Sequence, residues 1–388
     1  MNMERERCKQ WSCTVHGVKK IIWSVLMIAV TGSAEMAGVR SFYDLAYVAD
    51  GGARQKLDLF VPETGEGPWP VIVWVHGGAW LAGSKADCLA LRQGLTQRGY
   101  AVASIGYRLS SDALFPAQIQ DCKAAIRWLR AHAKAYHLDP ARFGAWGSSA
   151  GGHLVALLGT SGSVKAFDVG ENLAESSRVQ AVCDYYGPTD LLRMDAHSHA
   201  TARFSHDAEN SPESRLIGGA IQKNQEKAVA ANPITYVTVD VPPFLIVHGD
   251  ADPVVPYGQS ELLFAALKNV GAAVQLHTIQ GAGHGQGFGG TNIDQMVVGF
   301  FDRCLKNATL PVVTATQTTS RASGELRAPA PARFTWKEVC RREGISEEGR
   351  VSRAAFKGPP QIFNRMDTNQ DGFLTQEDFS DDTNRPRK

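Results

Sequence analysis

The chain has 388 residues, 40 lysines and arginines against 39 aspartates and glutamates, and a hydrophobic share of 44%. This length is too great for one small domain and predicts two or three units, or one large α/β domain with an appendage. The hydrophobic share suffices for a sizeable core. The formal net charge of +1 argues against a nucleic-acid binder driven by a basic field and against an acidic disordered protein.

Residues 1–34 have the pattern of a secretory signal peptide. Lys19 and Lys20 precede an apolar run at 21–30, and small residues then allow cleavage after Ala34. This run is too short for a bilayer core, which needs about 20 apolar residues. An uncleaved anchor is the alternative. We therefore expect a secreted or periplasmic protein whose mature chain has no transmembrane segment.

From residue 39 to residue 306, strand-like and helix-like segments alternate. Residues 71–75 form a continuous apolar run, typical of a strand buried on both faces, and residues 101–105, 143–146, 179–183 and 244–247 have a similar pattern. The clearest helical pattern begins at Pro116 and extends to about Tyr136, with apolar residues on one face. This alternation predicts an α/β fold with a doubly wound, mostly parallel sheet and helices on both sides.

Two glycine-rich motifs follow predicted strands. His76-Gly-Gly-Ala-Trp80 follows the first buried run, and Gly147-Ser-Ser-Ala-Gly151 follows the third and opens a helix. The second motif is G-x-S-x-G between strand and helix, which makes Ser149 the candidate nucleophile. The N–H groups of Gly77, Gly78 and Ala150 would form an oxyanion hole. Ordinary small-residue turns are the alternative, but both motifs stand where ligands bind in open α/β sheets.

A serine hydroxyl needs a base and an orienting acid, which follow it in this chain order in such folds. The turn after the strand at 244–247 carries Asp250 and Asp252. His284 lies further on, in a glycine-rich loop after an alternating segment. It is the one histidine that both follows the acid and lies in such a loop at the end of a predicted strand. His248 precedes the acid turn, and we expect it to be structural. The residues alone leave both aspartates open as the acid.

Four ordered motifs resemble those of the α/β-hydrolases. They are His76-Gly-Gly-Ala-Trp80, Gly147-Ser-Ser-Ala-Gly-Gly-His153, Asp184-Tyr-Tyr-Gly-Pro-Thr-Asp190 and His248-Gly-Asp-Ala-Asp-Pro-Val-Val-Pro256. Over about residues 39–306 they are most similar to bifunctional feruloyl and acetyl-xylan esterases, near the hormone-sensitive-lipase-like esterases. The resemblance implies a catalytic set of Ser149, Asp252 and His284, with Asp250 as the second choice for the acid. It also implies ester hydrolysis through an acyl-enzyme, without a cofactor for catalysis.

Residues 307–333 are rich in threonine, proline and alanine, as linkers are. The segment after them, 334–380, resembles a pair of EF-hands. In its second loop the Ca²⁺ ligands would be Asp367, Asn369, Asp371, Phe373 through its carbonyl, Thr375 and Asp378. Asp378 stands where a bidentate glutamate is expected, so we expect a weak site.

The first loop of this pair, Gly344–Ala355, has glycine at its sixth position and Val351 at its eighth, but poor ligands. We expect it to pack against the second loop without binding metal. A polar turn is the alternative interpretation of the second loop.

Other chemistry-bearing residues give weaker indications. Five cysteines remain after the leader, so at least one thiol is expected to stay free or to pair with another molecule: Cys88, Cys122, Cys183, Cys304 and Cys340. His197, His199 and His206 loosely resemble a zinc set in a polar, irregular segment.

The leading prediction is a secreted serine esterase acting on acetyl or feruloyl esters of polysaccharide. Alternatives are a general carboxylesterase or lipase for small esters, a peptidase resembling the prolyl oligopeptidases, and a catalytically inactive calcium-dependent binding protein. The full set of serine, acid and histidine argues against the inactive protein.

Overall fold

The computed structural model describes residues 38–198, 201–202, 204–306, 336, 339–340, 345–346, 348–353, 355–356 and 372–379. The chain divides into two compact units near residue 312. The predicted signal peptide at 1–34 and linker at 307–333 lie outside the described residues. Within these residues no helix is long and apolar enough to cross a membrane.

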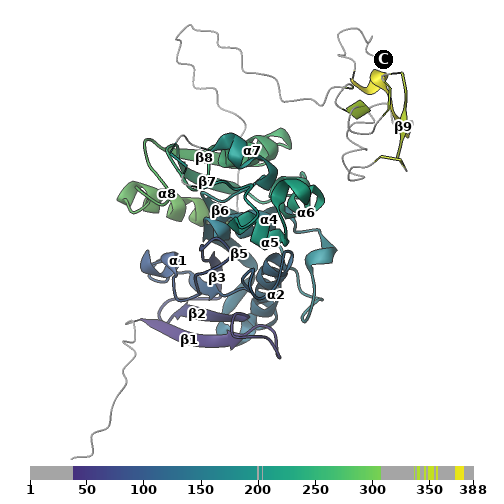
Figure 1. Ribbon diagram of the computed structural model, residues 1–388. Coiled ribbons are helices and arrows are strands. Elements are labelled where there is room, and N and C mark those ends of the chain that lie inside the picture. Colours follow the sequence, from purple (N-terminus) through teal and green to yellow (C-terminus); the bar gives the residue numbers. More distant parts are fainter. Residues whose placement is uncertain are drawn as a thin grey trace, which may run out of the picture. The chain divides into compact units, whose positions relative to one another are not determined.

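The first unit is built on an eight-stranded sheet (Figure 1). In chain order its strands are β1 (Val39–Ala46), β2 (Lys56–Pro62), β3 (Trp69–Val75), β4 (Ala101–Ile105), β5 (Leu138–Ser148), β6 (Ala181–Tyr185), β7 (Phe244–Gly249) and β8 (Val274–Ile279). Their spatial order is β1-β2-β4-β3-β5-β6-β7-β8. The pairs β1–β2 and β2–β4 are antiparallel, and every other pair is parallel. The predicted mostly parallel sheet is therefore confirmed, with an antiparallel edge.

Helices cover both faces of this sheet. The α-helices are α1 (Leu89–Arg92), α2 (Ala117–Ala131), α3 (Ala133–Tyr136), α4 (Ala150–Thr160), α5 (Pro212–Ile217), α6 (Gln225–Ala231), α7 (Gly258–Asn269) and α8 (Thr291–Phe301). Short 3₁₀ turns occupy Lys165–Phe167, Leu191–Arg193, Asp195–His197, Ile221–Lys223 and Pro233–Tyr236, and a π turn occupies Asp302–Lys306.

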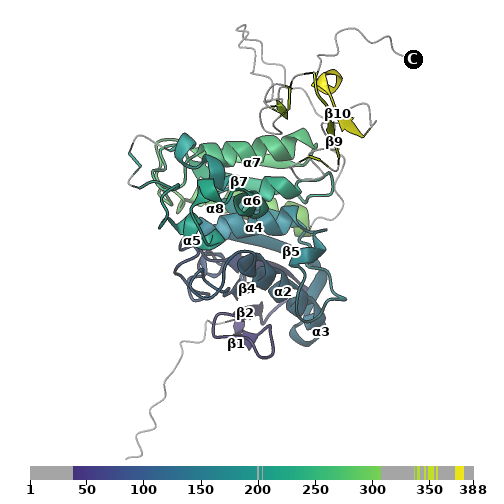
Figure 2. The same ribbon diagram turned by 45° about the vertical axis from the view of Figure 1, so that its right-hand side comes forward.

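Two hydrophobic cores lie on opposite faces of the sheet, because side chains alternate along each strand. Val71 and Val73 of β3 pack with α2, α4 and α7, whereas Ile72 and Trp74 pack with α1 and α8. Figure 1 shows α1 and α8 on one side of the sheet and α2, α5 and α6 on the other. Figure 2 brings α2, α4 and α6 toward the viewer. The central strands are mostly apolar because both of their faces are buried.

The helix predicted from Pro116 to Tyr136 is interrupted. α2 ends at Ala131, His132 is its C-terminal cap, and α3 follows. The predicted apolar face is fully buried, and so are Lys123 and Arg127 next to it.

The segment at 161–178 contacts the buried cationic side chains of α2. Lys123 donates to the carbonyls of Ser161 and Val164, and Arg130 donates to those of Ser176 and Arg178. Arg127 forms an ion pair of 2.9 Å with Asp168 of the same segment. A stretch without regular structure is thereby bound to the helix through its own backbone carbonyls.

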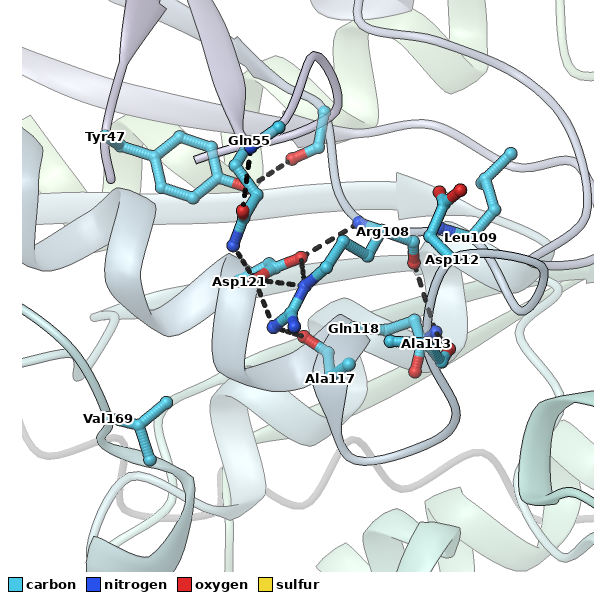
Figure 3. A network of polar contacts seen from close by, with 12 residues as sticks. Tyr47, Gln55, Arg108, Leu109, Asp112, Ala113, Ala117, Gln118, Asp121 and Val169 are labelled. Carbon is cyan, nitrogen blue, oxygen red and sulfur yellow. Dashed lines mark hydrogen bonds and ion pairs between the residues drawn. The ribbon is translucent and has the colours of Figure 1, made fainter. Parts of the chain in front are cut away.

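A second polar network fastens the loop after β4 to α2 (Figure 3). The Arg108 guanidinium forms a two-pronged contact with Asp121, with Nε–Oδ2 and Nη2–Oδ1 distances of 2.9 and 2.8 Å. The Arg108 backbone N–H and the Gln55 side chain also donate to Asp121, which is 2% exposed. Such a paired arginine fixes geometry as well as adding energy.

The second unit holds a small core and a two-stranded sheet. β9 (Val351–Ser352) pairs antiparallel with β10 (Phe373–Leu374), with Leu374 opposite Val351. A 3₁₀ turn covers Gln376–Phe379. The core consists of Trp336, Val339, Cys340, Val351 and Leu374. The predicted ligands Asp367, Asn369 and Asp371 lie outside the described residues, so the metal loop stays a prediction.

Candidate active site

The candidate residues gather at one edge of the sheet. β3, β5, β7 and β8 are mutually parallel, so their carboxyl ends share that edge. The loops that follow these strands carry Gly77, Ser149, Asp252 and His284. Loops at this edge are where open α/β sheets bind ligands.

Ser149 lies on a strained turn between β5 and α4. Its φ is 56° and its ψ is −123°, a conformation that costs a non-glycine residue about 1–3 kcal/mol. Its N–H donates to the Tyr185 carbonyl at 2.8 Å, and its own carbonyl accepts from His153 at 3.0 Å. A Cβ on Gly151 would lie 2.1 Å from the Val75 carbonyl oxygen. Tight backbone approach therefore requires glycine beside the serine, as the motif predicts.

The structure brings Ser149, His284 and Asp252 into one hydrogen-bonded series. The Nε2 atom of His284 lies 3.1 Å from Ser149 Oγ, and its Nδ1 atom lies 2.7 Å from Asp252 Oδ2. The carboxylate accepts, so Nδ1 carries the hydrogen and Nε2 is free to accept from the serine hydroxyl. The His284 side chain is 24% exposed and that of Asp252 is 0% exposed. A buried acid thus orients a base that reaches the surface.

The geometry also separates the two candidate acids. Asp250 Oδ1 accepts from the Gly281 N–H at 2.6 Å and so fastens the loop that carries His284. Only Asp252, of these two, contacts the His284 ring. Of the two aspartates that the sequence left open, Asp252 is therefore the one placed to orient His284.

Asp252 sits among hydrogen-bond donors. Its Oδ1 accepts from the N–H groups of Val254 and Val255 at 2.8 and 3.0 Å. Burial alone would raise the pKa of Asp252, but the hydrogen bonds from His248 and His284 outweigh it and hold the pKa well below its usual range. The acid is thus ionised whenever His284 acts as a base.

The predicted oxyanion donors lie on the loop after β3 and at the start of α4, beside Ser149. A Cβ on Gly77 would lie 2.8 Å from the Ser148 carbonyl oxygen and 3.3 Å from Ser149 Cβ, so this loop runs against the serine turn. Gly78 has a φ of +114°, which favours glycine. In the described part of the chain, the N–H groups of Gly77, Gly78 and Ala150 donate to no protein acceptor. They remain available to an anionic oxygen.

The loop after β4 contacts the His76–Trp80 loop, which carries two of the predicted oxyanion donors. Tyr107 stacks on His76 with ring centres 4.4 Å apart and donates to the His76 carbonyl at 3.0 Å. The Ser110 N–H donates to the Trp80 carbonyl at 2.8 Å. The contact of Arg108 with Asp121 (Figure 3) lies between these two supports and fixes their loop on α2.

Sequence reasoning gave Asp184 no role of its own, although it opens one of the four motifs. It is 0% exposed at the end of β6, and its Oδ1 accepts from the Gly187 N–H at 2.9 Å. Among the described residues, its Oδ2 has no hydrogen-bond partner. A Cβ on Gly152 would lie 2.4 Å from Asp184 Oδ1, so this carboxyl lies directly under α4. Burial raises the pKa of Asp184 to about 7.

We expect Asp184→Asn to flatten the pH dependence of stability. Below the ordinary carboxyl pKa, Asp184 is protonated in both the folded and the unfolded wild type, so no free-energy penalty arises from burying its charge. The penalty grows as pH rises past that value and is complete above about 7, on the order of 1–4 kcal/mol. The melting temperature of the variant minus that of wild type should therefore rise between pH 4 and pH 8. Parallel melting curves over this range would contradict the prediction.

The remaining histidines and cysteines form no second centre in the described residues. His206 pairs with Glu213 at 2.9 Å, His197 lies beside Gln259, and His199 is outside the described residues. No group of three potential metal ligands occurs in the described parts of the chain. Cys88, Cys122, Cys183 and Cys304 form no disulfide within the described residues, and burial raises the pKa of Cys122 and Cys183. Such thiols are unreactive.

Comparison with known proteins finds esterases that are similar to the first unit. A family model described as BD-FAE matches residues 57–267, and one described as TAP-like protein matches residues 222–315. Esterase LipQ of Mycobacterium tuberculosis is 34% identical over 59% of this chain and 53% of its own length. The chain thus spans about half the length of the curated relatives that it matches first.

Two solved structures are also similar. A truncated carbohydrate esterase from gut microbiota is 34% identical with a TM-score of 0.62, covering 68% of this chain and 95% of that one. A bifunctional GH43-CE protein of Bacteroides eggerthii is 37% identical with a TM-score of 0.63, covering 68% of this chain and 35% of that one.

Proposed function

The chain belongs to the BD-FAE family of α/β-hydrolases, and on this premise we propose that it is a serine carboxylic-ester hydrolase that works through an acyl-enzyme. The observation that carries the proposal is the hydrogen-bonded series from Ser149 through His284 to Asp252. Three residues of the types that acyl transfer requires meet there at the required distances. The family resemblance inferred from the four motifs is confirmed.

Each residue of the series has a chemical task. His284 Nε2 takes the proton as Ser149 Oγ attacks the ester carbonyl, and Asp252 stabilises the imidazolium that forms. The N–H groups of Gly77, Gly78 and Ala150 hold the negative oxygen of the tetrahedral intermediate. His284 then gives the proton to the departing alcohol. Water attacks the acyl-enzyme with His284 again as base, and the carboxylic acid leaves.

We propose acetyl or feruloyl esters of polysaccharide as the substrates, acted on outside the cytoplasm. Two of the similar structures are named as a carbohydrate esterase and as a bifunctional GH43-CE protein, which supports a carbohydrate ester. The signal-peptide pattern at residues 1–34 supports secretion or a periplasmic location. A general carboxylesterase for small esters is the second candidate, because the similar LipQ is named simply as an esterase.

We expect the protein to release acetate from acetylated xylan or ferulate from feruloylated arabinoxylan. The measurement compares both polymers with p-nitrophenyl acetate, and acid release is quantified by chromatography. Cleavage of p-nitrophenyl acetate alone would leave the serine esterase and discard the polysaccharide. Inactivity on every ester would favour the calcium-dependent binding protein.

We also propose that the loop at residues 367–378 binds Ca²⁺. Gly372, at the sixth position of this loop, has a φ of +84°, as the sharp turn of an EF-hand loop needs. Leu374 and Val351 are the eighth residues of the two aligned loops, and β9 and β10 pair them directly. This pairing supports the interpretation of the segment as two associated loops. Asp378 in place of glutamate supports a weak site.

We expect the full chain to bind one Ca²⁺ with a Kd of about 10⁻⁴–10⁻³ M, the range of weak extracellular modules. Isothermal titration calorimetry measures it. Asp367→Ala should abolish binding because it removes the first ligand, while Asp381→Ala, outside the loop, should not. Equal binding by both variants would contradict the proposed site. Ca²⁺ removal should leave ester hydrolysis unchanged, since the mechanism uses no metal.

A further inference from the structure

Asp252 is held by two imidazole rings rather than one. On the side away from Ser149, His248 Nε2 lies 3.2 Å from Asp252 Oδ2, and His248 Nδ1 lies 2.7 Å from Ser260 Oγ. The same Oδ2 atom accepts from His284 at 2.7 Å. The residues form a mirrored series of serine, histidine, aspartate, histidine and serine.

The partners of His248 fix where its hydrogen lies. Its Nε2 faces Asp252 Oδ2 and, at 2.9 Å, the carbonyl oxygen of Val255. Both are acceptors, so Nε2 must carry a hydrogen. In the neutral ring Nδ1 is then an acceptor, and the Ser260 hydroxyl donates to it. His248 and Ser260 are 0% exposed, so water does not compete for these groups.

We propose that His248 is a positioning residue for the reaction, which holds the Asp252 carboxylate so that Oδ2 stays directed at His284. The inference rests on the proposed function and deepens it. The Val254 and Val255 N–H groups anchor only Oδ1. Without His248, the remaining donor to Oδ2 among the described residues would be His284 alone, the ring that Asp252 must itself orient. His248 thus supplies the rigid support that an orienting acid needs.

Two tyrosines are the other titratable groups that face these rings. Tyr186 packs edge-on against His284 with ring centres 4.6 Å apart, and Tyr257 lies 5.6 Å from His248. Burial raises the pKa of Tyr186 to about 12, and the Tyr257 hydroxyl bonds Thr278 Oγ1 at 2.5 Å. Among the described aromatic rings near Asp252, those of His248 and His284 are the two that contact its carboxylate.

The test compares His248→Leu with His248→Gln in the full chain. Leucine removes the donor, whereas the glutamine amide can place an N–H near the position of Nε2. For the leucine variant we expect kcat on p-nitrophenyl acetate to fall about 10- to 100-fold, the effect of one hydrogen bond to a charged group, with little change in KM. The glutamine variant should recover most of this loss. Equal kcat losses in both variants would overturn the inference.

A pH profile separates positioning from packing. Without the His248 donor, Asp252 Oδ2 presents more negative charge to the His284 ring, so the acid limb of kcat/KM should move to higher pH. Loss by poor packing alone would lower kcat/KM equally at every pH, and that result would also overturn the inference.

A third variant covers the case in which His248→Leu does not fold. Ser260→Ala removes the hydroxyl that fixes the ring tautomer, and we expect a smaller, several-fold loss of kcat. If His248→Leu does not fold, wild-type kcat and a wild-type acid limb in Ser260→Ala would overturn the inference. Wild-type kcat in a folded His248→Leu would overturn it as well. Full activity of Asp252→Asn would instead defeat the proposed function itself.

Discussion

Ser149→Ala is expected to lower kcat/KM for p-nitrophenyl acetate by about 10⁴- to 10⁶-fold, because the acyl-enzyme can no longer form. The fold should survive. In the described residues the Ser149 hydroxyl bonds only His284, and alanine tolerates the turn as well as serine does. Steady-state kinetics measure the loss, and an unchanged melting temperature shows that the variant is folded.

Ser148→Ala is the matched control for this experiment. Ser148 is the neighbouring serine of the same motif, at the end of β5, but its hydroxyl does not contact His284 in the described structure. We expect its kcat/KM to stay within about tenfold of wild type, since a lost neutral hydrogen bond has a modest effect. A large loss of activity in Ser148→Ala together with an active Ser149→Ala would show that the assignment of Ser149 as the nucleophile is wrong.

Asp252→Asn is expected to lower kcat by about 10⁴-fold. An amide group that turns its N–H toward His284 Nδ1 favours the tautomer with the hydrogen on Nε2, and that ring cannot accept the Ser149 proton. KM should change far less, because Asp252 is buried away from the substrate. Initial rates at saturating p-nitrophenyl acetate measure the effect.

Asp250→Asn provides a control two residues away in the same turn. Its amide oxygen can still accept from the Gly281 N–H, so the loop that carries His284 stays fastened. We expect activity within a few-fold of wild type. If instead Asp250→Asn were inactive and Asp252→Asn active, the acid of the series would have been assigned to the wrong carboxylate.

The sequence predicts well those features that depend on residues close together in the chain. The five buried strands are rich in apolar residues, and β3 is an unbroken apolar run from Val71 to Val75, because both faces of a central parallel strand are covered. The serine turn needs glycines beside it, and so Gly147 and Gly151 mark it. The edge strand β1 was not singled out, since a half-exposed antiparallel strand lacks such a run. β2 is buried, but Lys56 and Asp58 interrupt its apolar residues.

Distant contacts account for what the sequence could not provide. Lys123, Arg127 and Arg130 would be expected on a solvated helix face, but residues 161–178 bind their charged groups, and Arg130 also lies over the Phe143 ring. The choice between Asp250 and Asp252 depends on side-chain direction within one tight turn. The contacts of His248 likewise depend on α7, which brings Ser260 against its ring.

The segment at 161–178 has a further consequence for the folded domain. It contains almost no regular structure, yet cationic side chains of α2 bind its carbonyl oxygens at several points. To enter a protease active site, such a segment would first have to detach these carbonyls and leave buried positive charges without partners. Cleavage there would therefore report opening of the domain as a whole and not the local breathing of a surface loop.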